Sequence, residues 1–222
     1  MIKAVIFDFD GLIVDTETPW FEVYSQIYRE HGTELPLQEW ARSIGASDKD
    51  FDPCGYLESL LQCSIDRAAI QNLSSERHTQ IMEGRKLLPG VADYLRGAHE
   101  MGLKVALASS SGREWVEKYL QRFKLLPLFD ALFTREDVRE VKPNPELYQK
   151  AIDHFGIPGD EAVAFEDSPN GLTAARGAGL YCVAVPNEIT SQLHFGPGSY
   201  DIRIGSMADQ TLKEIIDTLD RL

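Results

Sequence analysis

The sequence predicts an α/β fold in which a doubly wound, Rossmann-like parallel sheet forms the core and an α-helical domain is inserted into it. Three patterns lead to this prediction. Short apolar runs of strand type recur along the chain, each later run is followed by apolar residues at helical spacing, and one long stretch near the N-terminus shows helical spacing only. Repeated alternation of strand and helix is typical of a parallel sheet covered by helices.

The first strand is predicted at residues 4–7, a run of four apolar residues that leads directly into Asp8, Asp10 and Gly11. A short, wholly apolar run indicates a strand that is buried on both faces. In parallel sheets, ligands bind just beyond the carboxyl ends of the strands. Because carboxylates beside a core are costly to desolvate without a compensating cation or hydrogen bonds, the two aspartates indicate a metal ion with a phosphorylated substrate.

The rest of the core is predicted from later strand-like runs and the helices that follow them. Apolar residues at helical spacing follow three of these runs, and a last helix closes the chain. The predicted strands are residues 103–108, 131–133, 162–165 and 181–185, and the predicted helices contain residues 115–123, 147–155, 171–178 and 212–219.

The stretch at residues 16–87 interrupts this alternation, because it contains helical patterns and no convincing strand. A connection between a strand and a helix normally has only a few residues, so this stretch is interpreted as an inserted helical cap. The core then comprises residues 1–15 and 88–222. The insertion leaves and returns beside Asp8 and Asp10, so we expect it to lie over them as a lid. Asp15 is expected to serve the start of its first helix.

The composition restricts the possible partners. The 222 residues include 22 Lys and Arg against 35 Asp and Glu, a formal net charge of −13. Nucleic acid and anionic membrane surfaces are therefore not expected as partners, and a phosphate site must be made locally cationic. The N-terminal apolar run is too short for a signal peptide, and no segment approaches the ~18 apolar residues that span a bilayer. We expect a cytoplasmic protein.

Polar residues follow the later strands, and the topology brings them to the same edge of the sheet. Ser109 and Ser110 offer hydroxyl and backbone N–H groups that can hold a phosphate. Lys142 offers a positive charge on a backbone stiffened by the next proline, and Glu166 with Asp167 forms a second acidic pair. The four acids provide oxygen ligands for a hard cation such as Mg²⁺.

The order of these motifs resembles the haloacid dehalogenase superfamily of phosphohydrolases. The matching stretches are residues 7–16, 107–111, 142–145 and 165–171. The helical insertion after the first strand resembles the small cap of the beta-phosphoglucomutase-like branch. The resemblance implies a phosphatase that acts on a small phosphate monoester.

The same resemblance implies roles for the acidic residues. Asp8 would be the nucleophile that forms an aspartyl-phosphate. Asp10 would protonate the leaving alkoxide and then deprotonate the water that hydrolyses the intermediate. Mg²⁺ would be ligated by the Asp8 carboxylate, the Asp10 backbone carbonyl and Asp167, with Glu166 in the outer shell.

The transferred phosphoryl group would be held by the remaining motif residues. By resemblance, Ser109, the Ser110 backbone N–H and Lys142 would bind its oxygens. Lys142 would also offset the charge of Asp8. The cap would set specificity, with Glu17, Trp20 and Lys49 as candidate substrate-binding residues.

Several alternative activities are weighed against hydrolysis. A sugar-phosphate mutase of this branch would have a histidine where this chain has Trp20 and an arginine near Lys49. Trp20 cannot relay a proton and Lys49 cannot form a bidentate fork, so hydrolysis is favoured. Dehalogenase chemistry is less favoured still, because it needs neither Mg²⁺ nor Asp10. A phosphorylatable receiver module would not have the late acidic pair or a helical insertion. A non-catalytic binding protein is disfavoured, because none of the expected catalytic positions is replaced.

The identity of the substrate is not encoded in an obvious motif. A small cap that opens indicates a soluble metabolite such as a sugar phosphate or phosphoglycolate, and we expect a monomer. The five histidines, His31, His78, His99, His154 and His194, show no metal-ligand spacing, and surface or helix-end positions are expected for them.

Overall fold

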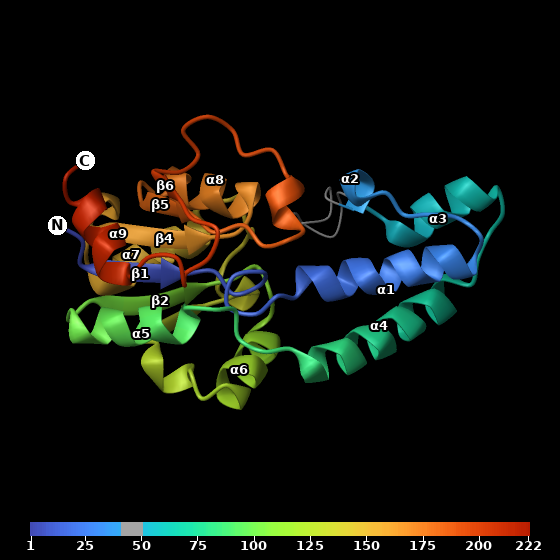
Figure 1. Cartoon of the computed structure of the whole chain (residues 1–222), viewed down its shortest axis with the longest axis horizontal. Helices are drawn as coiled ribbons and strands as arrows, with labels where there is room; N and C mark the ends of the chain where they lie inside the picture. Colours follow the sequence, from blue (N-terminus) through green and yellow to red (C-terminus); the bar gives the residue numbers. More distant parts are fainter. Residues whose placement is uncertain (41–50) are drawn as a thin grey trace.

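The structure of the protein is a computed structural model that describes residues 1–40 and 51–222. Figure 1 shows a sheet with helices on both faces and, beside it, a group of helices formed by the N-terminal third of the chain. In the described part of the chain, no helix is both long and apolar enough to cross a membrane.

The described residues form one sheet of six parallel strands in the order β3-β2-β1-β4-β5-β6. The doubly wound parallel sheet expected from the sequence is confirmed. β6 was not predicted, because two residues are too few to show a pattern. The strands are β1 Ala4–Phe7, β2 Lys104–Ala108, β3 Ala131–Phe133, β4 Ala162–Glu166, β5 Tyr181–Ala184 and β6 Ile202–Arg203.

Helices cover both faces of the sheet because successive side chains of a strand point to opposite sides. Val5 and Phe7 of β1 pack with α5, α6 and α9, whereas Ala4 and Ile6 pack with α7 and α8. Both apolar faces are thereby buried, as the wholly apolar strand predicted. The helices are α5 Val91–Glu100, α6 Arg113–Arg122, α7 Glu146–Phe155, α8 Pro169–Gly177 and α9 Leu212–Leu219.

Short 3₁₀ turns complete the core. They connect its strands and helices. One of them, η5, lies next to Ile189, which packs with the helical group. The turns are η2 Leu126–Leu128, η3 Arg135–Asp137, η4 Gly159–Glu161 and η5 Thr190–Gln192.

The four helices that the structure describes between β1 and α5, named here the helical insertion, have a hydrophobic cluster of their own. That cluster includes Val23, Ile27, Trp40 and Leu57, and it also buries Ile189 next to η5 of the core. The described part of the insertion contains no named strand, in line with its sequence pattern. Its helices are α1 Glu17–Glu30, α2 Leu37–Trp40, α3 Pro53–Leu61 and α4 Arg67–Gly84. The sequence pattern also indicates a helix at residues 37–44, of which residues 41–44 lie outside the described ones.

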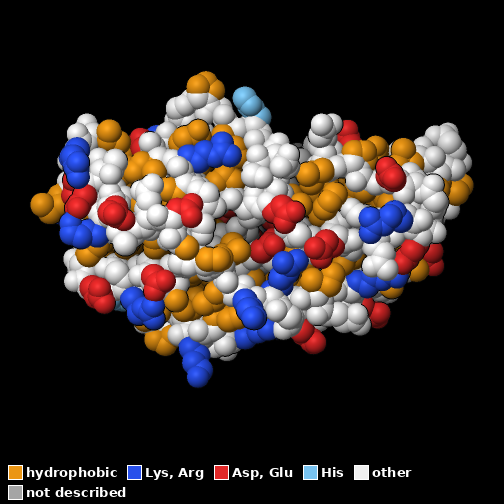
Figure 2. Space-filling model, viewed as in Figure 1, with side chains coloured by type: hydrophobic (Ala, Val, Ile, Leu, Met, Phe, Trp, Pro, Cys, Tyr) orange, Lys and Arg blue, Asp and Glu red, His pale blue; other side chains and the backbone are white. Residues whose placement is uncertain are grey.

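The two connections between core and insertion run side by side. Val14 and Leu87 form an antiparallel bridge, and Arg85 pairs with Asp15 at 3.2 Å. Asp15 also accepts a hydrogen bond from the Thr18 backbone N–H at 3.0 Å, which confirms its predicted place at the helix start. Figure 2 shows acidic and basic side chains together where the insertion meets the core. The insertion therefore leaves and re-enters the core at one place, although the boundary at residues 16 and 87 stays a prediction.

Candidate active site

The predicted motif residues lie at the carboxyl ends of adjacent strands. Asp8 follows β1, Ser109 follows β2, Lys142 lies in the connection between β3 and α7, and Glu166 ends β4 with Asp167 directly after it. Oxygens of Asp8, Glu166 and Asp167 all lie within 4.8 Å of one another. The fold thus brings residues from distant parts of the chain into one buried acidic cluster.

Lys142 is the cation of this cluster. Its Nζ lies 2.5 Å from Asp8 Oδ1 and 2.6 Å from Glu166 Oε1, and its side chain is 4% exposed. The Tyr148 hydroxyl donates to the same Glu166 oxygen. Lys142 is therefore held between two carboxylates at the end of the first strand.

Asp167 is oriented by a residue from the next strand connection. The side-chain amide of Asn187, after β5, donates to Asp167 Oδ2 at 2.9 Å and to the Gly11 carbonyl at 3.1 Å. Gly11 has φ +77°, and a Cβ there would lie 2.1 Å from Asp167 Oδ2. Only a glycine leaves room for this carboxylate against the loop that carries Asp8.

Burial and mutual repulsion dominate the electrostatics of the cluster. Burial, followed by the charge of Glu166, raises the pKa of Asp8 to about 8. Burial also raises the pKa of Asp167 well above its usual range, with Asp8 as the next cause. Burial acts to lower the pKa of Lys142, but Asp8 and Glu166 outweigh it and keep the side chain an ammonium.

The cluster fits a divalent cation. When ionised, its three carboxylates face one ammonium, and an additional positive charge would offset the excess. Glu166 Oε2 is buried and accepts no hydrogen bond from the described residues. A purely oxygen donor set of this kind suits Mg²⁺.

Asp10 has different partners from Asp8. Ser109 Oγ lies 3.2 Å from Asp10 Oδ2, and the indole N–H of Trp115 donates to Asp10 Oδ1 at 3.1 Å. The Ser111 backbone N–H donates to Ser109 Oγ at 3.0 Å. Asp8 and Asp10 are therefore separated by environment, since the first faces Lys142 and the second faces the β2–α6 connection. Ser110 is in the same connection, and its backbone carbonyl accepts from Arg135 Nε at 3.1 Å.

The candidate substrate residues of the insertion differ in their positions. Glu17 begins α1 and is half-buried; burial, then the charges of Asp10 and Asp8, raise its pKa to about 8. Trp20 stacks on His78, with ring centroids 3.8 Å apart and an interplanar angle of 11°. Lys49 lies outside the described residues. Glu17 is thus close enough for the charges of Asp8 and Asp10 to raise its pKa. Trp20 packs on another side chain of the insertion.

Sequence reasoning missed four residues of this site: Trp115, Tyr148, Asn187 and His78. The first two sit at ordinary core spacing in helices, and Asn187 has no motif around it. For His78 the expected surface or helix-end position is wrong. Its ring is buried between aromatic side chains of two helices, an arrangement that no local pattern reveals.

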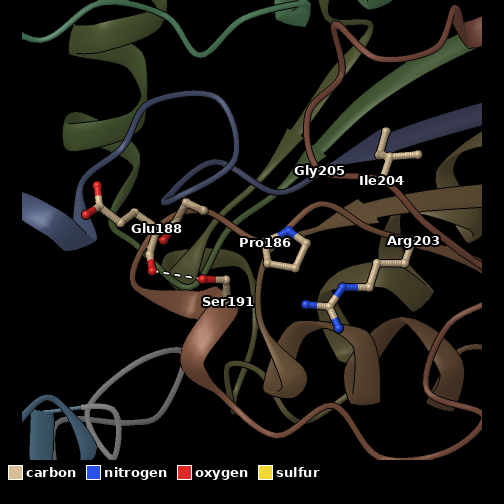
Figure 3. A pocket seen from close by; sticks show the side chains of 7 residues that line it. Pro186, Glu188, Ser191, Arg203, Ile204 and Gly205 are labelled. Atoms are coloured by element: carbon tan, nitrogen blue, oxygen red, sulfur yellow. Dashed lines mark hydrogen bonds between the residues drawn. The ribbon is translucent and has the colours of Figure 1, made fainter.

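An open hollow of about 390 Å³ adjoins the site on the side of β5 and β6 (Figure 3). It is lined by residues 186–188, Ser191 and residues 203–205. In it, Ser191 Oγ donates to the Glu188 carbonyl at 2.9 Å. Its link to the acidic cluster is Asn187, so the hollow lies next to the cluster and does not contain it.

Comparison with known proteins agrees with this geometry. A family model described as "Haloacid dehalogenase-like hydrolase" matches residues 5–185. The chain is 46% identical over 220 residues to "Putative phosphatase YhcW" of Bacillus subtilis (strain 168), covering 99% of both chains. It is 29% identical over 217 residues to hexitol phosphatase B of Escherichia coli (strain K12), covering 97% of both.

A solved structure extends the likeness to the whole fold. A Thermotoga maritima protein described as "putative beta-phosphoglucomutase" superposes with a TM-score of 0.75 at 25% identity, covering 100% of both chains. The likeness therefore includes the inserted helices as well as the sheet.

Proposed function

We propose a reaction for this chain, which belongs to the haloacid dehalogenase-like hydrolase family and is a phosphoric monoester hydrolase. It hydrolyses a small phosphate monoester, with Mg²⁺, through an aspartyl-phosphate on Asp8. The observation that carries the proposal is the contact of Lys142 with Asp8 inside the acidic cluster. In this contact the proposed nucleophile and the proposed phosphate-binding cation lie side by side.

The chemistry assigned to the chain has two steps. An Asp8 oxygen attacks phosphorus while the bond from phosphorus to the ester oxygen breaks, and Asp10 gives its proton to that oxygen. In the second step Asp10 takes a proton from water, whose oxygen attacks phosphorus and releases phosphate and free Asp8. The separate partners of the two aspartates support these separate roles.

The phosphoryl oxygens would be held by Lys142, the Ser109 hydroxyl and the Ser110 backbone N–H. Ser109 Oγ already lies beside the acid–base residue, 3.2 Å from Asp10 Oδ2, so the phosphoryl site and the leaving-group site adjoin each other. Lys142 would also reduce the repulsion between Asp8 and an anionic ester.

The metal would be held by the carboxylates of Asp8 and Asp167 and by the Asp10 backbone carbonyl. Glu166 would belong to the outer shell, since one of its oxygens is already occupied by Lys142 and Tyr148. When bound, Mg²⁺ supplies charge stabilisation for an anionic phosphoryl group.

The helical insertion is proposed to act as a cap over the site, with the core at residues 1–15 and 88–222 and the cap at residues 16–87. Glu17, which interacts electrostatically with Asp8 and Asp10, would face the hydroxyl groups of a sugar or polyol phosphate. The name of hexitol phosphatase B supports this substrate class. Trp20 and Lys49 remain candidate contacts. The cytoplasmic location and the monomeric state also stay predictions.

The alternative activity is a sugar-phosphate mutase. It is supported by the likeness of the fold to the solved Thermotoga maritima protein described as "putative beta-phosphoglucomutase". In a mutase the phosphoryl group passes from Asp8 back to a sugar hydroxyl. Hydrolysis is preferred because Trp20 is stacked on His78 and has no group that relays a proton.

The experiment that tests the proposal measures phosphate release from sugar phosphates, hexitol phosphates and phosphoglycolate, with and without Mg²⁺. Asp8→Asn is compared with Asp93→Asn, an exposed aspartate of α5. Mg²⁺-dependent release by the wild type and by Asp93→Asn, but not by Asp8→Asn, is expected. Borohydride added during turnover is expected to reduce the acyl phosphate to homoserine at position 8, which mass spectrometry detects.

Two results would contradict the proposal. Near-normal release by Asp8→Asn would remove Asp8 as the nucleophile. Absence of release from every ester, with isomerisation of a hexose 1-phosphate, would identify a mutase.

A further inference from the structure

Trp115 contacts the acid–base residue directly. Its indole Nε1 lies 3.1 Å from Asp10 Oδ1, and the Ser109 hydroxyl lies 3.2 Å from the other oxygen, Oδ2. An indole N–H can only donate, whereas a serine hydroxyl can donate or accept. Trp115 therefore holds Oδ1 as an acceptor, and with Ser109 on the other oxygen it fixes the orientation of the Asp10 carboxyl group.

The Trp115 ring is fixed from two sides. Within α6, Tyr119 packs against it with centroids 4.7 Å apart and an interplanar angle of 62°. From the insertion, the ring of His78 in α4 stacks on it at 5.7 Å and 27°. One neighbour belongs to the core and the other to the helical insertion.

The stack continues into the insertion. His78 lies between Trp115 and Trp20, and its centroid is 3.8 Å from that of Trp20 in α1. Three aromatic rings from α1, α4 and α6 thus form a column that ends at Asp10. His78 is 3% exposed, so the column is shielded from water at its middle ring.

A second contact joins α4 to α6. The guanidinium of Arg122, in the last turn of α6, donates to the Met82 carbonyl at 2.9 Å and also to the Glu83 carbonyl, at the end of α4. The pair of helices is held at both the His78 and the Arg122 positions. The place of Trp115 against α4 is therefore set by the docking of the insertion on the core.

We propose that Trp115 is a positioning residue for the general acid Asp10, and that the insertion secures it through the rings of His78 and Trp20. The inference rests on the proposed function, because it takes Asp10 as the group that protonates the leaving oxygen. Trp115 itself touches no reacting atom; it orients the carboxyl group that does. When the bond from phosphorus to the ester oxygen breaks, the proton moves from Asp10 to that oxygen.

A packing role and a positioning role predict different effects on two kinds of substrate. An alkyl phosphate has a basic leaving oxygen that needs protonation, whereas the 4-nitrophenolate of p-nitrophenyl phosphate leaves without it. In kcat/KM, which reports formation of the aspartyl-phosphate and not its hydrolysis, loss of a positioned acid slows only the first ester, because general acid catalysis is worth about 10²–10⁴-fold where it is needed. A purely structural defect would slow both esters alike.

The experiment compares kcat/KM for a hexitol phosphate and for p-nitrophenyl phosphate in the wild type and in Trp115→Phe, which keeps a ring and removes the N–H. We expect the hexitol phosphate value to fall about 10-fold or more, while the p-nitrophenyl phosphate value changes less than about 3-fold. Trp40→Phe, the same substitution in the hydrophobic cluster of the insertion, is the matched control and should leave the ratio of the two values unchanged. His78→Ala, which removes the middle ring, should lower the ratio in the same direction as Trp115→Phe.

A second variant separates the N–H from the shape of the ring. Benzothienylalanine at position 115 replaces the indole N–H by sulfur and keeps the bicyclic ring, so it should reproduce the selective loss even if Trp115→Phe folds poorly. Equal loss on both esters, or no loss, would overturn the inference. Absence of phosphate release by the wild type from both esters would instead contradict the proposed function.

Discussion

Glu166 lies directly across the backbone of Gly171, so that a Cβ on Gly171 would come within 1.9 Å of Glu166 Oε2. Gly171 belongs to the first turn of α8, and Glu166 is the last residue of β4. The glycine is therefore required by the position of a buried carboxylate. That carboxylate in turn contacts Lys142 at 2.6 Å, so the spacing of helix and strand helps to set the position of the cluster's cation.

The first prediction follows from this contact. Gly171→Ala should reduce phosphate release about 100-fold, because an added methyl must displace Glu166 and Lys142, and a displacement of ~1 Å at a catalytic site costs about that much. Gly84→Ala is the matched control, since a Cβ there meets nothing within 4 Å. Rates are measured alongside circular dichroism. Near-wild-type rates in Gly171→Ala would mean that Glu166 has no part in holding Lys142.

The second prediction concerns Asn187, which orients Asp167 through a bond of 2.9 Å. Asn187→Ala should weaken Mg²⁺ binding about 10-fold, because residues that orient a metal ligand typically affect affinity by 10–100-fold. Isothermal titration of Mg²⁺ into the protein measures this without turnover. Ser191→Ala, an exposed neighbour, should bind as the wild type does. Unchanged affinity in Asn187→Ala would exclude this supporting role.

The third prediction uses the pKa of His78, which burial lowers from 6.5 to about 4. The native state keeps this ring neutral, while the unfolded chain takes up a proton below pH 6.5. The stability contribution of His78 is complete above about pH 6.5 and is lost as the pH falls toward 4. Urea unfolding should show the wild type losing on the order of 2–3 kcal/mol more than His78→Phe over this range. Parallel curves for the two proteins would show that burial does not lower the pKa of His78 in the native state.

The fourth prediction compares two buried tyrosine hydroxyls. Tyr148 donates to the Glu166 carboxylate, and Tyr28 donates to the neutral Pro53 carbonyl at 2.6 Å. Tyr148→Phe should lower the free energy of unfolding by about 2 kcal/mol and Tyr28→Phe by about 1 kcal/mol, because hydrogen bonds to charged groups are the stronger ones. Urea denaturation measures both. A smaller loss for Tyr148→Phe than for Tyr28→Phe would indicate that Glu166 finds a replacement donor.

Much of the fold could be predicted from local patterns. Residues 4–7 form a wholly apolar run, and the structure shows a strand there that is buried on both faces. The absence of strand patterns in residues 16–87 likewise predicted helices, and the described part of the insertion contains helices. β6 was missed because it has only two residues and pairs with β5 through tertiary packing.

The site was predictable in part. Asp8, Ser109, Lys142, Glu166 and Asp167 each lie at the end of a strand or in the connection after it, so the rule that parallel strands end at one edge was enough to group them. The partners of these residues were not predictable. His78 was expected at a surface or helix end, and it is buried instead because α1 and α6 both pack against α4.

The sequence by itself determined the parallel sheet, the order of the motifs and the assembly of the acidic cluster, because these depend on periodicity within short segments and on the common direction of the strands. Only the tertiary structure decided what orients each acid. Asn187 meets Asp167 from 20 residues away, and Trp115 meets Asp10 from 105 residues away. Contacts of this kind depend on how helices pack across the sheet and on where the insertion docks, and neither leaves a pattern in the residues that make the contact.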